Sequence, residues 1–359
     1  MQRSAPDRHG QQKDTAMQKK YSVLSLQILV LVSSLLVGAQ ASAQNINLVI
    51  GYPPGASYDI YARTFARHLG KHLPGNPTIV PQNMPGAGSL VAANHLYTTA
   101  PKDGSTIGMF ARGVAMQPLL DNQGVQYDAQ KFNWIGSLSS ETSIVLSWHT
   151  KPFKTLDDVR SREMIVAASG SGADSVIFPY IMNGVLGTKF KLITGYPGNT
   201  DMLLAVERGE VDGNAGTSWS GLTSSKSEWI RDKKINVIIQ LGSKKHPDLG
   251  NVPLVMDLAK NESDRGVLEL IFSRQQMAYP LVAPPGVPAE RVQLLRQAFE
   301  AVMKDPEYRA DVQKQGLEVD SMRGVEIEAL LRKIYATPPE VVARARAAIE
   351  DGKNVTTSK

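Results

Sequence analysis

Residues 51–69 read GYPPGASYDIYARTFARHL, and they place two prolines, a glycine and a serine between an apolar run and an amphipathic helix. The apolar run at 46–52 predicts a strand, and the apolar residues from Ala62 to Leu69 follow at the spacing of one helix face. The first amides of a helix have no partner within it, and this end carries about half a positive charge. The stretch therefore predicts a strand, a turn that can hold an anion, and a helix.

The first 43 residues have the three parts of an export signal. Two lysines after Met17 precede an apolar stretch at 23–37, and Ala41-Ser42-Ala43 completes the pattern. The apolar stretch is shorter than the roughly 20 residues that a membrane span needs. We expect a leader at 1–43, with Met17 as a plausible start of translation, cleavage after Ala43, and export to the periplasm.

The basic character of the chain belongs largely to this leader. The formal net charge is +5, but residues 1–43 hold five Lys and Arg against two Asp, so the rest of the chain carries +2. A nucleic-acid partner is therefore not expected. Cysteine is absent, which excludes disulfides and the lipid-bearing cysteine of a lipoprotein. The remaining length of 316 out of 359 residues favours two domains.

Downstream of the leader, short apolar runs alternate with helical periodicity, which predicts an α/β fold with mainly parallel strands. Strands are expected at 46–52, 78–80, 106–110, 143–148, 164–168, 190–194, 211–214, 235–241 and 277–283. Helices are expected at 62–73, 90–97, 155–160, 174–186, 199–208, 288–303, 305–315 and 338–349, with Pro179 bending the fourth or marking its true start.

The middle of the chain has the pattern of a second α/β unit inserted into a first, with crossings near Leu146 and Tyr279. This pattern predicts one lobe from 44–146 and 280–359 and an inserted lobe at 147–279. A cleft between two such lobes is where small ligands usually bind.

Three strand-to-helix turns, at 53–57, 85–89 and 169–174, are rich in small residues. A helix end contributes roughly 0.3–1 kcal/mol, whereas micromolar binding needs about 8 kcal/mol, so several amides and hydroxyls must converge on one anion. Each turn alone is better explained as a tight turn with a helix cap, but the presence of three such turns in one chain favours an anion site. The absence of GxGxxG and GK[ST] argues against a phosphate-loop enzyme.

These turns belong to a set of motifs that resembles the Bug-type periplasmic solute-binding family, the substrate-binding receptors of tripartite tricarboxylate transporters. The motifs span almost the whole chain after the leader, in the family's order. They are Tyr52-Pro53-Pro54-Gly55 with Asp59 and Ala62-Arg63, Gln82-Asn83-Met84-Pro85-Gly86-Ala87-Gly88, Ala100-Pro101-Lys102-Asp103-Gly104, Ser169-Gly170-Ser171-Gly172, Gly209-Glu210-Val211-Asp212 and Ala283-Pro284-Pro285-Gly286-Val287-Pro288.

The resemblance implies a two-lobed, type II periplasmic binding protein fold in which each lobe is a mainly parallel sheet flanked by helices. It implies a receptor, and not an enzyme, that closes on a small organic carboxylate and delivers it to the membrane permease subunits of a tripartite transporter. Backbone amides of the first turn, at 55–59, and of the inserted lobe's first turn, at 169–174, would grip the carboxylate. No catalytic residue, metal or cofactor is expected, and the protein is expected to be a monomer.

On this basis we expect ligand contacts along both turns and from the strand ends beside them. The chain departs from the family at Ala56-Ser57-Tyr58, where a second glycine is usual, and at 194–200, where a common lysine is missing. The expected contact residues are Tyr52, Gly55, Ala56, Ser57, Asp59, Gly86, Ala87, Arg112, Ser169, Ser171, Gly172, Ala173, Asp174, Tyr196, Thr217, Ser218 and Trp219.

Several of these residues have a second interpretation. Arg112 follows the third strand, where its guanidinium would pair with a carboxylate, but most arginines at strand ends are solvated or pair with a surface acid. Tyr196 and Trp219 would stack on an organic ligand or pack in the core. Asp59 would contact a ligand amino group or cap its own helix, and the cap is favoured.

Two other functions fit parts of the sequence. One is an exported α/β enzyme that acts on a carboxylate, and the other is a ligand sensor for a membrane signalling partner. His68 and His72 have metal-capable spacing, but no third ligand is evident, so a surface pair is the favoured interpretation.

Overall fold

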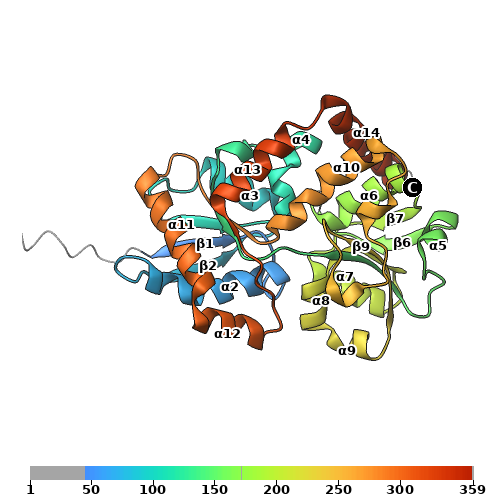
Figure 1. Cartoon of the computed structure of the whole chain (residues 1–359), viewed down its shortest axis with the longest axis horizontal. Helices are drawn as coiled ribbons and strands as arrows, with labels where there is room; N and C mark the ends of the chain where they lie inside the picture. The colour runs from blue at the N-terminus through green and yellow to red at the C-terminus, as the bar shows by residue number, and fades with distance from the viewer. Residues whose placement is uncertain (1–44, 171, 358–359) are drawn as a thin grey trace, which may run out of the picture. The chain divides into compact units, whose positions relative to one another are not determined.

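Two β-sheets organise the part of the chain that the computed structural model describes, residues 45–170 and 172–357 (Figure 1). The predicted leader and Ser171 lie outside the described residues. The first sheet has six strands in the order β11-β4-β10-β3-β1-β2. Its strands are β1 (Ile46–Ile50), β2 (Ile79–Asn83), β3 (Thr106–Met109), β4 (Asn133–Ser137), β10 (Pro280–Ala283) and β11 (Met322–Arg323).

The second sheet has five strands in the order β7-β6-β8-β5-β9. Its core strands carry the buried Ile144 and Leu146 of β5 and Val166 of β6. Its strands are β5 (Ser143–Trp148), β6 (Met164–Ala167), β7 (Phe190–Ile193), β8 (Gly213–Ser218) and β9 (Ile235–Leu241).

Each sheet is mixed, so the expectation of mainly parallel sheets is wrong. In the first sheet β1 is parallel to β2 and β3, but β10 is antiparallel to β3 and β4, and β11 is antiparallel to β4. In the second sheet β6 is parallel to β7 and β8, whereas β5 is antiparallel to β8 and β9. An apolar run reports burial and not direction, which is why the pattern could not separate the two arrangements.

The connections between the sheets lie close to the predicted crossings. The chain leaves the first sheet at Ser137 and enters the second at Ser143, so residues 138–142 make the first connection, slightly before Leu146. Residues 242–279 make the return connection, and β10 begins directly after Tyr279. The assignment of every residue to one lobe or the other remains a prediction.

Helices cover the sheets, and most of the expected ones are present with ends shifted by a few residues. Helix α6 runs continuously through Pro179, whereas α4, α8, α9, α10 and α13 were not expected. The helices are α2 (Ser57–Leu69), α3 (Leu90–Thr98), α4 (Gln117–Leu120), α5 (Leu156–Ser161), α6 (Asp174–Leu186), α7 (Asn199–Glu207), α8 (Trp219–Ser225), α9 (Ser227–Arg231), α10 (Glu262–Phe272), α11 (Ala289–Lys304), α12 (Pro306–Lys314), α13 (Gly324–Tyr335) and α14 (Pro339–Thr357).

The last two helices pack on different sides of the molecule. Helix α13 packs against β4 of the first sheet, while α14 packs against α6 and α10, as the red ribbon in Figure 1 shows. The segment at 336–338 between them is therefore a further link between the two sides. None of the helices in the described residues has the length and hydropathy that crossing a membrane requires.

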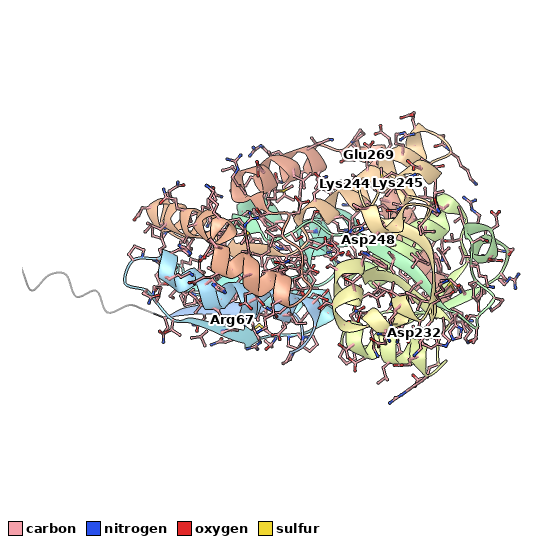
Figure 2. The ribbon with its side chains drawn as sticks, turned by 60° about the horizontal axis from the view of Figure 1, so that its bottom comes forward. Arg67, Asp232, Lys244, Lys245, Asp248 and Glu269 are labelled. Carbon is pink, nitrogen blue, oxygen red and sulfur yellow. The ribbon has the colours of Figure 1, made fainter. Side chains whose placement is uncertain are left out.

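Helix α2 is held in place along its whole length. Its apolar face, including Tyr61, Phe65 and Leu69, is buried with β1, and α11 and α12 pack against it. Arg67, labelled in Figure 2, pairs with Asp311 of α12 at 2.8 Å. Just beyond the C-terminal end of α2, Asp305 caps α12 by accepting from the Glu307 amide at 2.9 Å.

Asp305 offers a test of this support for α2. It also accepts from Lys71 at 2.6 Å and His72 at 3.0 Å, and these two hydrogen bonds hold the pKa of its carboxyl well below the usual range. Asp305→Ala should lower the free energy of unfolding by about 1–2 kcal/mol, because it removes both the cap and the ion pairs. Asp305→Asn should cost less, because asparagine also caps helices well.

The ion-pair part should depend on pH. A depressed carboxyl pKa stabilises the fold above the pKa of the unfolded state, about 4, and this stabilisation is lost as the pH falls. The difference between the wild type and Asp305→Asn, measured by urea unfolding, should therefore be smaller at pH 3 than at pH 7. An equal difference at the two values would contradict this account.

Candidate functional site

A cavity of about 70 Å³ lies between the two sheets and is lined from both. We call it the central cavity. On the first-sheet side it is lined by Tyr52, Ala56, Ser57, Tyr58, Ala111, Arg112 and Tyr279, and on the second-sheet side by Ser169, Ala173, Asp174, Ser175, Gly198, Asn199, Met202, Gly216 and Ser218.

The start of α2 presents free amides at this cavity. The turn before the helix uses some of its own donors: the Ala56 amide donates to the Pro53 carbonyl at 3.3 Å, and the Gly55 amide donates to Asp59 at 2.9 Å. Among the described residues, the amides of Ser57, Tyr58 and Asp59 have no hydrogen-bond partner, as expected for the first turn of a helix. The available donors thus begin at Ser57, two residues later than predicted.

Asp59 holds this turn together. Its carboxylate accepts from the Gly55 amide, from Arg63 at 2.8 Å and from the Asn83 side chain at 2.8 Å. Gly55 has a φ of 80°, a conformation that glycine adopts without strain. Asp59 therefore binds its own turn and does not line the cavity, in line with the favoured interpretation as a cap.

A buried ion pair joins the two sides of the cavity. Arg112, in the short helix after β3, is 4% exposed, and its Nε and Nη2 both lie 2.7 Å from one oxygen of Asp174 at the start of α6. Nη2 also donates to the Ser143 hydroxyl at 3.0 Å. Burial acts to lower the pKa of Arg112, but the Asp174 carboxylate together with Tyr58, Glu141 and Tyr279 outweighs burial and raises the pKa above its ordinary value. Arg112 is therefore charged and paired.

A second arginine lies behind Asp174. Arg274 is 1% exposed, and its Nη1 lies 3.5 Å from the other Asp174 oxygen. Its Nε donates to the Ile271 carbonyl at 3.0 Å, while its buried Nη2 has no hydrogen-bond partner among the residues that the structure describes. Burial lowers the pKa of Arg274 against the opposing effect of Asp174. No sequence pattern marks Arg274, because a single arginine in an irregular segment resembles any surface arginine.

Tyrosine rings form much of the wall. Tyr52 and Tyr58 stack with ring centres 4.6 Å apart, and Tyr58 meets Tyr279 edge to face at 5.0 Å. Burial raises the pKa of the Tyr58 hydroxyl to about 12, so this ring is neutral at physiological pH. The wall is therefore apolar with a few fixed hydroxyl groups.

Glu141 ties the two connections between the sheets to the second sheet. This residue lies in the 138–142 connection and is 7% exposed. Its carboxylate accepts from Ser218 at 2.5 Å, Ser220 at 2.6 Å and Tyr279 at 3.0 Å. Ser218 and Tyr279 also line the central cavity. Sequence reasoning missed Glu141, because the three side chains that donate to it lie at least 77 residues away in the chain.

The loop after β9 of the second sheet also reaches residues on the first-sheet side of the molecule. Lys244 lies 3.7 Å from Asp320, and His246 lies 3.5 Å from Glu318. Figure 2 labels Lys244 with Lys245 and Asp248 of the same loop. These partly exposed ion pairs contribute little stability on their own.

The two other glycine-rich turns meet backbone to backbone. A Cβ atom on Gly170 would lie 2.5 Å from the Gly88 nitrogen, and one on Gly88 would lie 2.7 Å from the Ala173 nitrogen. The Ala173 amide also donates within its own turn, to Gly170 at 2.9 Å. Close contact between the two sides is thus a reason for glycine at these positions, apart from any anion.

A second cavity of about 340 Å³ adjoins the first, and both are lined by Tyr52 and Ser169. It is otherwise formed by the first turn, the turn after β2, and residues 195–197. We call it the adjoining cavity.

The structure brings many of the predicted contact residues together, while their contact with a ligand remains a prediction. Those that line the central cavity are Tyr52, Ala56, Ser57, Arg112, Ser169, Ala173, Asp174 and Ser218, and those that line the adjoining cavity include Gly86, Ala87 and Tyr196. The residues that line neither are Gly55, Asp59, Gly172, Thr217 and Trp219, and Ser171 lies outside the described residues.

Two of these residues have roles in packing. Trp219 is 5% exposed within a hydrophobic cluster, and its indole nitrogen lies 3.5 Å from Asp248. The Thr217 hydroxyl donates to Asn214 at 2.7 Å. The lining residues that were not predicted include Tyr58 and Tyr279. Tyr58 follows Ser57 of the predicted turn, and Tyr279 lies at a predicted crossing. Both could therefore have been predicted from their positions in the sequence.

The contact between the glycine turns predicts a cost for a single methyl group. Gly170→Ala should lower the free energy of unfolding by about 1–3 kcal/mol, because the new Cβ meets backbone atoms that cannot rotate away. Gly250→Ala is the matched control, since a Cβ there meets nothing within 4 Å, and it should change stability by less than about 0.5 kcal/mol. Similar urea midpoints for the two variants would refute the close contact.

The ion pair predicts a non-additive result. Arg112→Met should lower the free energy of unfolding by about 3 kcal/mol, because it leaves the Asp174 carboxylate without its main partner. Adding Asp174→Asn to Arg112→Met removes that charge and should restore part of the loss. Urea unfolding of the single and double variants measures this, and a double variant less stable than Arg112→Met would argue against a buried pair.

Comparisons of this chain with known proteins agree on one family. The model of the tripartite tricarboxylate transporter family receptor matches residues 61–337. A Cupriavidus necator protein, described as the UPF0065 protein in gbd 5′ region, is 28% identical over 293 residues, which cover 78% of this chain and 82% of that protein.

Solved structures share the two-lobed periplasmic binding protein fold. The periplasmic binding protein BugD is 20% identical, with a TM-score of 0.64, over 87% of this chain and 97% of its own. Rpa4515 of R. palustris, solved with adipate, is 17% identical, with a TM-score of 0.67, over 85% and 98%. MatC of Rhodopseudomonas palustris, with bound malate, is 19% identical, with a TM-score of 0.66, over 86% and 99%. The chain belongs to the tripartite tricarboxylate transporter receptor family.

Proposed function

We propose that the protein is a periplasmic receptor that captures a small organic carboxylate in the central cavity and delivers it to the permease subunits of a tripartite transporter. The family assignment supports a receptor and not an enzyme. The relatives solved with adipate and malate support a carboxylate as the ligand. The binding of a carboxylate in this cavity and its delivery to a permease are both parts of the proposal.

The observation that carries the proposal is the free start of α2 at a cavity lined from both sheets. The amides of Ser57 and Tyr58, which line the cavity, have no partner among the described residues, and the Ser57 side chain lies beside them. Hydrogen bonds to a charged group are worth about 1.5–3 kcal/mol each, so these two amides and the Ser57 hydroxyl approach the roughly 8 kcal/mol of micromolar binding. The helix end itself adds a smaller, favourable term.

Entry of a ligand requires the two sides to separate, because the cavity is lined from both and is small. The connections at 138–142 and near Tyr279 are the natural hinges, and Glu141 links them. In this proposal, the two lobes that close on the acid are built on the two sheets. Their predicted bounds, 44–146 with 280–359 and 147–279, are adjusted so that β5 (Ser143–Trp148) and α14, which packs on α6, belong with the second sheet.

A thermal-shift screen tests the proposal. Protein freed of bound ligand by unfolding and refolding should melt about 5 °C or more higher with its carboxylate present at 100 times Kd. The screen should include aliphatic monocarboxylates, di- and tricarboxylates, aromatic acids and amino acids. No shift with any acid would count against the receptor, and chemical change of the bound acid during recovery would favour an exported enzyme.

A proline substitution isolates the amides. Ser57 is the first residue of α2 and follows an extended Ala56, so Ser57→Pro fits the backbone while removing both the amide and the hydroxyl. Ser57→Ala should weaken binding about tenfold, and Ser57→Pro about a hundredfold. Ala289→Pro, at the start of α11, is the matched control and should leave binding unchanged. Full affinity in Ser57→Pro would exclude the helix end as the carboxylate site.

A further inference from the structure

The charged side chains around the central cavity are already paired with one another. Arg112 and Asp174 line the cavity from opposite sides and lie 2.7 Å apart. Both are largely buried, since the Arg112 side chain is 5% exposed and that of Asp174 is 12% exposed. A ligand carboxylate that enters here therefore meets a self-neutralised pair and not a free cation.

The groups behind the cavity extend this balance. Arg274 lies 3.5 Å from Asp174, and Glu141 accepts from Ser218 and Tyr279 of the cavity wall. Two arginines and two carboxylates leave no net side-chain charge. The Nη2 of Arg274, which has no hydrogen-bond partner among the described residues, does not change this charge balance. The Arg274 side chain lines neither cavity, and its Nη1 lies 2.7 Å from where a Cβ of Gly113 would be.

The positive potential in the central cavity thus comes from helix starts and not from side chains. Helices α2 and α6 begin at the cavity from opposite sides, and each start carries about half a positive charge, so the two together match a single carboxylate. Helix α7 also begins there, but Asp201 in its first turn offsets its own start. A second carboxylate held near the first would lie in the same small space as Asp174 without a cation of its own. An unpaired charge in a buried site is strongly unfavourable. The electrostatics of the site therefore favour one negative charge.

The adjoining cavity has room for the rest of the ligand. Its volume is about 340 Å³, against about 70 Å³ for the central cavity, and the two share Tyr52 and Ser169 in their walls. Among the described residues that line it, none is charged; they are glycines, prolines, serines, an alanine and two tyrosines. This wall suits an aliphatic or aromatic body.

We infer that the ligand is a monocarboxylate: its carboxylate binds at the start of α2, and its uncharged body extends past Tyr52 into the adjoining cavity. The inference rests on the proposed function, since it assumes that the central cavity takes a carboxylate. It sets this chain apart from the relatives solved with adipate and malate, which are dicarboxylates.

Matched acids test the number of charges. Titration calorimetry on refolded, ligand-free protein would compare butyrate with succinate, and hexanoate with adipate, because each pair has the same chain length and differs by one carboxylate. Where either member of a pair binds, the monocarboxylate should bind at least tenfold more tightly. Equal or tighter binding of succinate or adipate would overturn the inference and leave the proposed function intact, whereas an absence of binding by every acid would contradict both.

The uncharged body has its own comparison. Norleucine is hexanoate with an added ammonium group, and both oxygens of Asp174 already face arginines at 2.7 and 3.5 Å. Norleucine should therefore bind at least tenfold more weakly than hexanoate. Binding as tight as that of hexanoate would show that Asp174 accepts the ammonium, and it would overturn the assignment of an uncharged body.

A substitution at Asp174 tests the electrostatic cause. Asp174→Asn removes one negative charge at nearly constant size and leaves two arginines near the cavity. The ratio of hexanoate to adipate affinity should fall at least tenfold, and a ratio is insensitive to a general loss of stability. Asp212→Asn is the matched control, since Asp212 pairs with Lys151 at 2.9 Å and lines neither cavity. An unchanged ratio in Asp174→Asn would refute this cause.

Discussion

The buried pair of Arg112 and Asp174 is the interaction on which the site depends. It joins the short helix after β3 of the first sheet to α6, which follows β6 of the second sheet. Both charges are largely removed from water. Because each charge meets the other, neither has to be met by a ligand. In the proposed function, the anion is attracted by the peptide groups at the starts of α2 and α6, whose partial charges cannot be titrated away.

The glycine-rich turns divide this work between two roles. The turn before α2 is closed by Asp59, so that its donors begin at Ser57 and face the cavity. The turns at 85–89 and 169–173 contain glycine where the two sides touch through their backbones. Turns of similar composition therefore leave free amides at a cavity in one place and allow close backbone packing in the others, and only the three-dimensional contacts separate the two.

The sequence was sufficient for most of the α/β elements. The runs that form β5 and β9 were located to the residue, because they are apolar and bounded by polar turns. Strand β4, NWIGS, was missed because it has little apolar pattern, and the direction of β5 and β10 could not be obtained from hydropathy. The first turn was predicted as a site on local grounds, and Ala56 and Ser57 of that turn line the central cavity, whereas their contact with a ligand stays a prediction.

The charges of the site were only partly predictable. Arg112 and Asp174 were both expected near a ligand, but their mutual pairing was not, since 62 residues separate them. Arg274 and Glu141 were missed altogether, because their partners come from distant segments. A charge balance of this kind is a property of the folded chain and has no local signature.

The placement of α14 has a mechanical consequence. The chain passes between the two sides at 138–142, at 242–279 and again at 336–338, where α13 on β4 gives way to α14 on α6. The 336–338 segment lines a cavity together with Ser243 and Ser273 of the return connection, so the second and third links lie side by side. A short third link at this edge restrains how far the two sides can move apart there, and its length sets that limit.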